Sequence, residues 1–136
     1  MTKKQIDDLT YNIIGCCINV HNALGPGLLE SVYHKCLIEE FSFQKIKFQS
    51  ELIVPVVYRD KEVKAQLRAD FFIENTIVLE LKAVDLLHPI HEAQLMTYLK
   101  LLDAPKGILV NFNSTNIFHN GQKTFVTENY RALKDK

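Results

Sequence analysis

The chain has 136 residues and no formal net charge, with 47% hydrophobic and 24% charged residues. This length and composition predict a single folded domain over residues 1–136 and exclude disordered, collagen-like and disulfide-stapled proteins. Zero net charge excludes a uniformly basic nucleic-acid-binding protein, so any such binding must come from a local patch. No apolar run approaches the ~20 residues that cross a membrane, and three cysteines, an odd number, predict reduced thiols and a cytoplasmic protein.

Helical periodicity comes first along the chain. Apolar residues recur at three- and four-residue steps over 6–24, which predicts a helix. Gly25-Pro26-Gly27 ends that helix, and a second one is predicted over about 28–43. Two helices therefore precede any strand.

The periodicity then changes to that of strands. We expect strands over 49–58, 63–73 and 77–84, the last two joined by a short turn at Glu74-Asn75-Thr76. Pro55 lies inside the first of these strands. A proline there predicts an edge position or a bulge, because it has no backbone N–H to donate.

A helix, a buried strand and a less regular tail complete the chain. The helix is predicted over 90–103, and the apolar strand over 106–112 should lie parallel to a neighbour because a helix precedes it. Asn120-Gly121 is a favourable hairpin dipeptide. We therefore expect short strands on either side of it, at 117–119 and 124–127.

Charged residues share one face of two neighbouring strands. Glu80 and Lys82 are two apart on a strand, so their side chains point the same way. A turn centred on Asn75 puts Asp70 opposite Glu80, and the same register puts Arg68 opposite Lys82. Opposed Cβ atoms lie about 5 Å apart, so the two carboxylates repel each other unless a positive charge lies between them. A divalent cation is one interpretation, and Lys82 or Arg68 alone is the other.

Short motifs connect these residues to a known family. Gly27, Glu30 and Tyr33 form a Gly-x-x-Glu-x-x-Tyr motif. Further similar stretches are Arg68-Ala69-Asp70, residues 78–84, 89–95, 97–100 and 110–113. On these motifs the chain resembles the GxxExxY protein family, a branch of the PD-(D/E)xK nuclease superfamily, over residues 6–113 in order. Ala69 replaces the superfamily's Pro, and the tail 114–136 lies beyond the resemblance.

The resemblance implies a fold and a metal site. The fold is α/β (α+β) with a restriction-endonuclease-like core: two N-terminal helices, a three-strand antiparallel meander, a helix and a further strand. In the superfamily the Asp and the Glu of ExK bind Mg²⁺, and a Glu of the early helix often joins them. Carried over, the ligands are Asp70, Glu80 and Glu30, with the backbone carbonyl of Leu81 as a fourth. Oxygen ligands suit Mg²⁺ or Mn²⁺ rather than zinc.

The implied activity is hydrolysis of DNA or RNA phosphodiesters by metal-activated water. In that mechanism Lys82 orients the water or stabilises charge on the phosphoryl oxygens. Gln94 occupies the helix that carries a polar site residue in related nucleases. The candidate substrate-binding residues are Arg68, His91 and Tyr98, of which Arg68 can hold a phosphate bidentately.

Each candidate also has a structural interpretation. Glu30 in a first helical turn suits the helix dipole, Tyr98 is typical of a core, and a single histidine such as His91 at a helix start is usually structural. Arg68 can instead be simply the counter-ion of Asp70 or Glu80. Tyr33 is expected to pack, with a hydrogen bond to a site carboxylate as its functional alternative.

Two other classes of protein fit the same residues. One is a nucleic-acid-binding module without catalysis, and the other is a protein-interaction domain in which Asp70, Glu80 and Lys82 form a charge network. A chain of this length would also need a second copy, as in a homodimer, to cut both strands of a duplex at once. Metal affinity and salt-dependent binding separate these classes.

Overall fold

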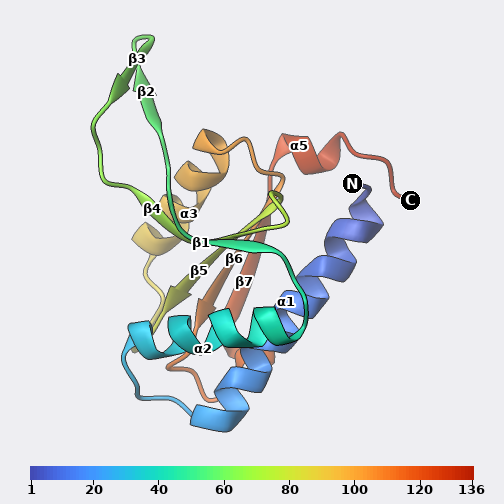
Figure 1. Ribbon diagram of the computed structural model, residues 1–136, viewed down its shortest axis with the longest axis vertical. Coiled ribbons are helices and arrows are strands. Elements are labelled where there is room, and N and C mark those ends of the chain that lie inside the picture. Colours follow the sequence, from blue (N-terminus) through green and yellow to red (C-terminus); the bar gives the residue numbers. More distant parts are fainter.

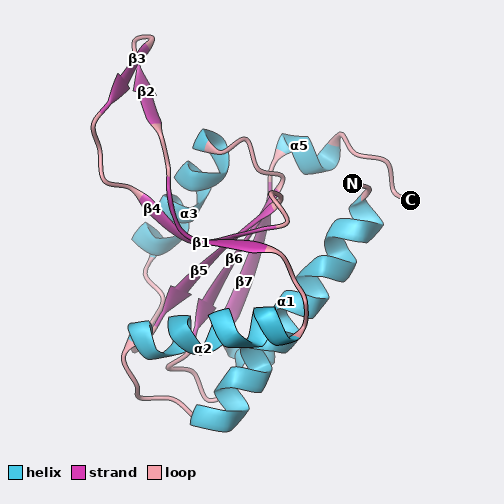
Figure 2. Cartoon of the chain, in the orientation of Figure 1, coloured by secondary structure: helices cyan, strands magenta, loops and turns pink.

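The computed structural model describes all 136 residues and is built around one five-stranded sheet in the order β1-β4-β5-β6-β7 (Figures 1 and 2). Strand β4 is antiparallel to both of its neighbours, β1 and β5, while β6 is parallel to β5 and β7 is antiparallel to β6. The strands are β1 (Phe48–Ile53), β2 (Val56–Tyr58), β3 (Lys61–Val63), β4 (Arg68–Ile73), β5 (Ile77–Lys82), β6 (Lys106–Asn111) and β7 (Gln122–Val126). This is the restriction-endonuclease-like arrangement expected, with the antiparallel meander formed by β1, β4 and β5.

Helices cover both faces of the sheet. The helices are α1 (Lys3–Leu24), α2 (Glu30–Phe43), α3 (Pro89–Leu101), α4 (Ile117–Asn120) and α5 (Glu128–Arg131). The larger core lies between the sheet and α1 with α2, and a smaller core lies between the sheet and α3. Because β5 is buried on both faces, Leu79 enters the larger core and Val78 the smaller one. None of the helices is long and apolar enough to span a bilayer.

The expected continuous strands over 49–58 and 63–73 are wrong, because the chain leaves the main sheet between them. After Val54 it forms a separate two-stranded sheet, β2 with β3, and it returns at Leu67. Pro55 cannot continue the backbone ladder, and the Val54 N–H donates to the carbonyl of Leu67 at 2.8 Å, closing the base of this hairpin. The expected edge position is confirmed for β1, which is the outermost strand on its side.

The turn between β4 and β5 has the register expected from the sequence. Phe71 lies opposite Leu79 and Ile73 opposite Ile77, which centres the turn on Asn75. Asn75 has a φ of 51°, the left-handed conformation that asparagine tolerates well. Asp70 and Glu80 are therefore brought to neighbouring positions just beyond the paired residues.

The tail corrects one expectation and extends the sheet. Residues 117–119 lie in the short helix α4 rather than in a strand, because the Asn116 side chain caps this turn by accepting from the His119 N–H at 3.0 Å. No hairpin forms around Asn120-Gly121. Strand β7 instead pairs with β6, whose expected parallel pairing with β5 is confirmed.

Candidate functional site

The centre of the candidate site lies where β4 and β5 stop pairing. The backbone hydrogen bonds between the two strands end at Phe71 and Leu79. Beyond this pair, hydrogen bonds from backbone N–H groups to side chains join the strands. The Asp70 N–H donates to Glu80 Oε2 at 2.6 Å, and the Leu81 N–H donates to Asp70 Oδ2 at 2.8 Å. Each carboxylate is thus fixed to the other residue's strand by one oxygen, so both are held rigidly in place.

Beyond these two bonds and the contact between the two carboxyl groups themselves, neither side chain has a partner in the protein. Glu80 is only 4% exposed, and its burial together with the negative charge of Asp70 raises the pKa of Glu80 to about 9. No buried side-chain polar atom of the protein lacks a hydrogen bond. The pair therefore places two adjacent carboxyl groups in a largely buried setting.

Glu30 lies in the same cleft as Asp70, at the first residue of α2. Burial and the negative charge of Asp70 raise its pKa, while the positive charge of Lys82 acts against them. The position of Glu30 depends on the preceding corner, where Gly25 and Gly27 adopt φ values of 74° and 96°. Glycine tolerates these values, and the corner turns the chain so that α2 begins beside the two strands.

Tyr33 holds this corner and does not contact a carboxylate. Its hydroxyl donates to the Gly25 carbonyl at 2.6 Å and accepts from the Leu28 N–H at 3.2 Å. Its ring stacks on Phe112 with 4.5 Å between centroids. The functional alternative of a hydrogen bond to a site carboxylate is therefore wrong, and the role of Tyr33 is to hold the corner before Glu30.

Lys82 lies near the carboxylates without forming an ion pair. Its positive charge lowers the pKa of Glu30, of Glu80 and of His91, so the ammonium lies within electrostatic reach of all three groups. The five ion pairs of the protein all involve other residues. Arg68 is exposed and likewise takes part in none of them. Neither cation acts as the fixed counter-ion of Asp70 or Glu80.

Helix α3 brings one buried hydroxyl close to the carboxylates. Tyr98 is 3% exposed, and burial together with the charges of Glu80 and Asp70 raises its pKa. His91 caps the helix start, since its Nδ1 accepts from the His88 N–H at 3.1 Å. Gln94 is exposed and makes no hydrogen bond to the protein, so the structure does not join it to the carboxylates.

The cleft contains residues that the sequence did not single out for the site. His34, one helical turn after Glu30, bonds Ser50 Oγ at 2.7 Å and stacks on Phe71 with 4.3 Å between centroids. Glu51 lines the same cleft from β1 in a left-handed conformation, with a φ of 51°, between the paired residues Ser50 and Leu52. The four-residue spacing from Glu30 was the available signal for His34, whereas nothing in the sequence indicates the conformation of Glu51.

Asn111 fixes the chain segment that follows Lys82. Its side chain is buried and donates to the Val84 carbonyl at 2.8 Å, while its carbonyl oxygen accepts from the Val84 and Asn113 N–H groups at 3.1 Å. These bonds join the end of β6 to the loop after β5. A polar residue at the end of an apolar strand was the sequence signal for this role.

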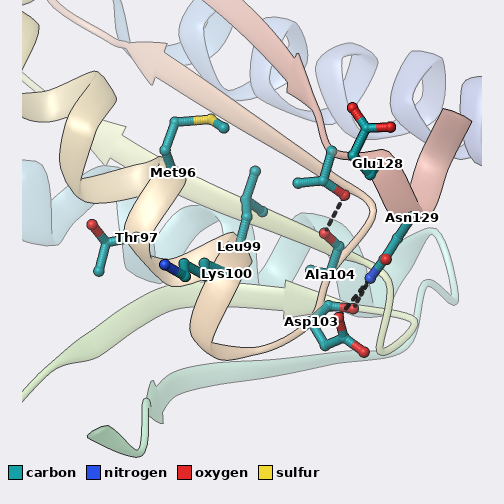
Figure 3. Close-up of a pocket in the computed structure, with 9 residues that line it drawn as sticks. Met96, Thr97, Leu99, Lys100, Asp103, Ala104, Glu128 and Asn129 are labelled. Carbon is teal, nitrogen blue, oxygen red and sulfur yellow. Dashed lines mark hydrogen bonds between the residues drawn. The ribbon is translucent and has the colours of Figure 1, made fainter. Parts of the chain in front are cut away.

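A second hollow lies away from these residues, between the end of α3 and the start of α5 (Figure 3). Its walls are tied together by hydrogen bonds from Thr127 to the Ala104 carbonyl and from Asn129 to Asp103. Lys100 is its only cationic side chain. None of the candidate site residues lines it, so it is not part of the candidate site.

The donor chemistry fits a hard divalent cation, although the ligands are not all assembled. No three acidic, histidine or cysteine side chains are grouped closely enough to hold a metal ion. Asp70 and Glu80 form a bonded pair, and Glu30 faces the same cleft as Asp70. All three are oxygen donors, which Mg²⁺ and Mn²⁺ prefer.

The fold and the carboxylate pair at the open end of two strands define a nuclease-like domain. Residues 7–124 match the family model of the PD-(D/E)XK nuclease superfamily, and the chain belongs to that superfamily. Nucleases of this superfamily generally use divalent metals. No curated protein and no solved structure matches the chain.

Proposed function

We propose that the protein is a Mg²⁺- or Mn²⁺-dependent nuclease that hydrolyses phosphodiester bonds in DNA or RNA. The observation that carries this proposal is the Asp70–Glu80 pair, in which two adjacent carboxyl groups lie in a largely buried setting with no cation paired to either of them. Burying two such groups without a counter-ion is costly. A bound divalent cation would remove that cost, whereas a protein used only for interactions gains nothing from it.

The proposed ligands are Asp70, Glu80 and Glu30, with the backbone carbonyl of Leu81. A cation bound there supplies Lewis-acid polarisation of the phosphate and a water of lowered pKa. Glu30 is only half-buried and lies at a helix start. The Glu30 side chain would have to turn toward Asp70 when the cation binds in order to complete the oxygen set.

Lys82 is the proposed electrostatic catalyst. Because its ammonium is not held in an ion pair, it can orient the attacking water or stabilise charge that develops on the phosphoryl oxygens. Arg68 and the free Nε2 of His91 are proposed to hold neighbouring phosphates. Tyr98 is proposed to bind the substrate through its hydroxyl, and Gln94 to contact the substrate from the exposed side of α3.

Other features support the finer assignment. The Gly27, Glu30 and Tyr33 motif favours the GxxExxY branch of the superfamily. Three free cysteines favour a reducing compartment such as the cytoplasm. We propose that two copies act together when both strands of a duplex are cut, because one chain offers one carboxylate pair.

The test is a cleavage assay on labelled single-stranded, double-stranded and branched DNA and RNA, with Mg²⁺, with Mn²⁺ and with EDTA. Wild-type protein and Glu80→Gln are purified in parallel. We expect metal-dependent cleavage by the wild type and none by the variant. Equal cleavage by both proteins would assign the activity to a contaminant, and no cleavage of any substrate would favour the non-catalytic binding module.

A further inference from the structure

The hairpin formed by β2 and β3 stands away from the rest of the domain (Figure 1). Its strands pair only with each other, and no residue from Val56 to Val63 is buried. Tyr58 is 66% exposed and Val57 61%. An isolated two-stranded hairpin is at best marginally stable in water, so such an arm is typical of an element whose partner lies outside the chain.

The two faces of this arm differ in charge. Val56 lies opposite Val63, and Tyr58 opposite Lys61, so these four side chains share one face. The acidic Glu62 lies opposite Val57 on the other face. One face is thus apolar, aromatic and basic, with no acidic strand residue.

Positive charge is concentrated along the arm and at its base. The segment 59–68 contains four basic residues and two acidic ones, in a chain whose net charge is zero. The basic residues are Arg59, Lys61, Lys64 and Arg68. The Arg59 guanidinium lies over the Tyr58 ring, 6.0 Å from its centroid. This is the local basic patch that nucleic-acid binding requires in a neutral protein.

The arm begins beside the candidate site. Arg68 is the first residue of β4 and precedes Asp70 by two positions, so the base of the arm and the carboxylate pair share a strand. Lys61 is nine residues from Asp70, which places the tip of the arm at most about 32 Å from that carboxylate. A duplex rising about 3.4 Å per base pair would therefore meet the arm within about nine base pairs of the cut.

We propose that the β2–β3 hairpin is a DNA-binding arm that enters the major groove of a B-form duplex beside the scissile phosphate. This inference rests on the proposed nuclease function and selects its substrate, duplex DNA. The major groove is about 12 Å wide and admits a two-stranded ribbon, whereas the major groove of A-form RNA is too narrow for side chains to read. The basic residues contact phosphates and base edges, and the Val56, Tyr58 and Val63 face contacts thymine methyl groups.

The test compares two variants of equal charge. The arm variant carries Arg59→Asn, Lys61→Gln and Lys64→Gln, with asparagine chosen because Arg59 has a φ of 50°. The control carries Lys4→Gln, Lys134→Gln and Lys136→Gln, near the chain termini and on the opposite side of the molecule (Figure 1). A third protein, Tyr58→Ser, changes the arm without changing its charge. Melting temperatures and circular dichroism establish that all three are folded.

Affinity for a labelled duplex of about 20 base pairs is measured in EDTA by fluorescence anisotropy, from about 50 to 200 mM salt. We expect the arm variant to bind at least about tenfold more weakly and to lose about 0.9 of the salt slope for each phosphate contact removed. Tyr58→Ser should weaken binding without changing the slope, and the control should stay within about threefold of wild type.

Three results would contradict the proposed role of the arm. The arm variant and the control could lose duplex affinity equally, or the wild type could prefer duplex RNA to duplex DNA. Sedimentation could also show a wild-type dimer that dissociates only in the arm variant. Cleavage of single-stranded DNA, which needs no groove, measures the nuclease separately. An arm variant that keeps this cleavage and loses duplex affinity supports the arm. If the wild-type protein cleaves single strands but does not bind duplex DNA, the proposed DNA-binding arm is wrong and the proposed nuclease function stands.

Discussion

Asp70 and Glu80 are linked through each other's strands: the Asp70 N–H donates to the Glu80 carboxylate at 2.6 Å, and Asp70 in turn accepts from the Leu81 N–H at 2.8 Å. These bonds replace the backbone ladder where the strands diverge. Each carboxylate has one oxygen fixed by a backbone N–H of the other strand. The two acids are therefore oriented before any ligand arrives, which lowers the cost of ordering them on binding.

Glu80→Gln should abolish divalent-metal binding and keep the fold. The amide keeps the shape and can still accept from the Asp70 N–H, while it removes the charge that a cation needs. Affinity for Mn²⁺ should fall by at least about 100-fold, because mutating a residue that merely orients a ligand already lowers metal affinity by about 10–100-fold. Titration calorimetry measures it.

The melting temperature of metal-free Glu80→Gln should match or exceed that of the wild type, because a buried carboxyl with a raised pKa is replaced by a neutral group. Glu39→Gln, an exposed residue of α2 that makes no ion pair and no side-chain hydrogen bond, is the matched control and should bind Mn²⁺ as the wild type does. Unchanged Mn²⁺ affinity in Glu80→Gln would remove Glu80 from the proposed ligand set.

Lys82→Ala should separate catalysis from metal binding. Lys82 forms no ion pair, so its loss leaves no buried charge unpaired. Turnover should fall by about 10²–10³-fold, as when one electrostatic donor to the transition state is removed. Mn²⁺ affinity should change little or rise slightly, since a nearby positive charge is lost.

Single-turnover cleavage at saturating Mn²⁺ measures this effect, with Lys100→Ala as a control at the far end of α3. An Lys82→Ala protein that unfolds would favour a structural charge network involving Lys82. An Lys82→Ala protein that cleaves at the wild-type rate would exclude Lys82 from the chemistry.

The adjacency of Asp70 and Glu80 was predictable from the sequence, because it depends only on the number of residues between each of them and the turn. The side-chain period of two and a turn centred on Asn75 were enough to place Asp70 beside Glu80, and the paired residues have that register. The parallel pairing of β6 with β5 followed from the intervening helix.

Features that depend on packing were not predictable. The segment between Val54 and Leu67 has the alternating pattern of a strand at both of its ends. Pro55 is the only residue that indicates that the chain leaves the main sheet there. The sequence allowed the Tyr33 hydroxyl to donate either to a site carboxylate or to a backbone carbonyl. The conformation of the glycine corner places the Gly25 carbonyl within reach, and the hydroxyl donates to it. The residues of β2 and β3 favour a strand locally, but they pack against no core. The sequence therefore gives no burial pattern from which the position of this hairpin could be predicted.

Metal affinity should rise with pH. Burial and Asp70 raise the pKa of Glu80 from 4.5 to about 9, and a cation must displace that proton. Affinity for Mn²⁺ should therefore increase by up to about tenfold per pH unit below pH 9. Titration calorimetry at several pH values measures this, and a Mn²⁺ affinity that does not change between about pH 6 and about pH 8.5 would contradict the prediction.

The stability of the metal-free protein should change in the opposite direction. Between pH 4.5 and about 9 the folded state keeps a proton on Glu80 that the unfolded state has released. The contribution of this group to stability is thus fully present below pH 4.5 and is lost as the pH rises toward about 9. Urea unfolding at about pH 6 and about pH 8.5, for wild type and Glu80→Gln, measures it. A pH dependence that is the same in both proteins would assign it to other groups.

Tyr33→Phe should loosen the corner that positions Glu30. The substitution keeps the ring that stacks on Phe112 and removes the hydroxyl that bonds Gly25 and Leu28. The free energy of unfolding should fall by about 1–2 kcal/mol, because the half-buried carbonyl of Gly25 loses its donor. Tyr11→Phe is the matched control, since Tyr11 is 78% exposed and makes no hydrogen bond through its hydroxyl.

If the corner also positions Glu30 for the cation, Tyr33→Phe should weaken Mn²⁺ binding by about 10–100-fold, the range for residues that orient ligands, while Tyr11→Phe leaves it unchanged. Glu30→Gln and the double variant complete a cycle. Because the hydroxyl acts on the cation only through Glu30, the double variant should bind no more weakly than Glu30→Gln alone. Additive losses would mean that Tyr33 affects the site by another route, and a Tyr33→Phe protein as stable as the wild type would mean that the glycine corner holds its shape unaided.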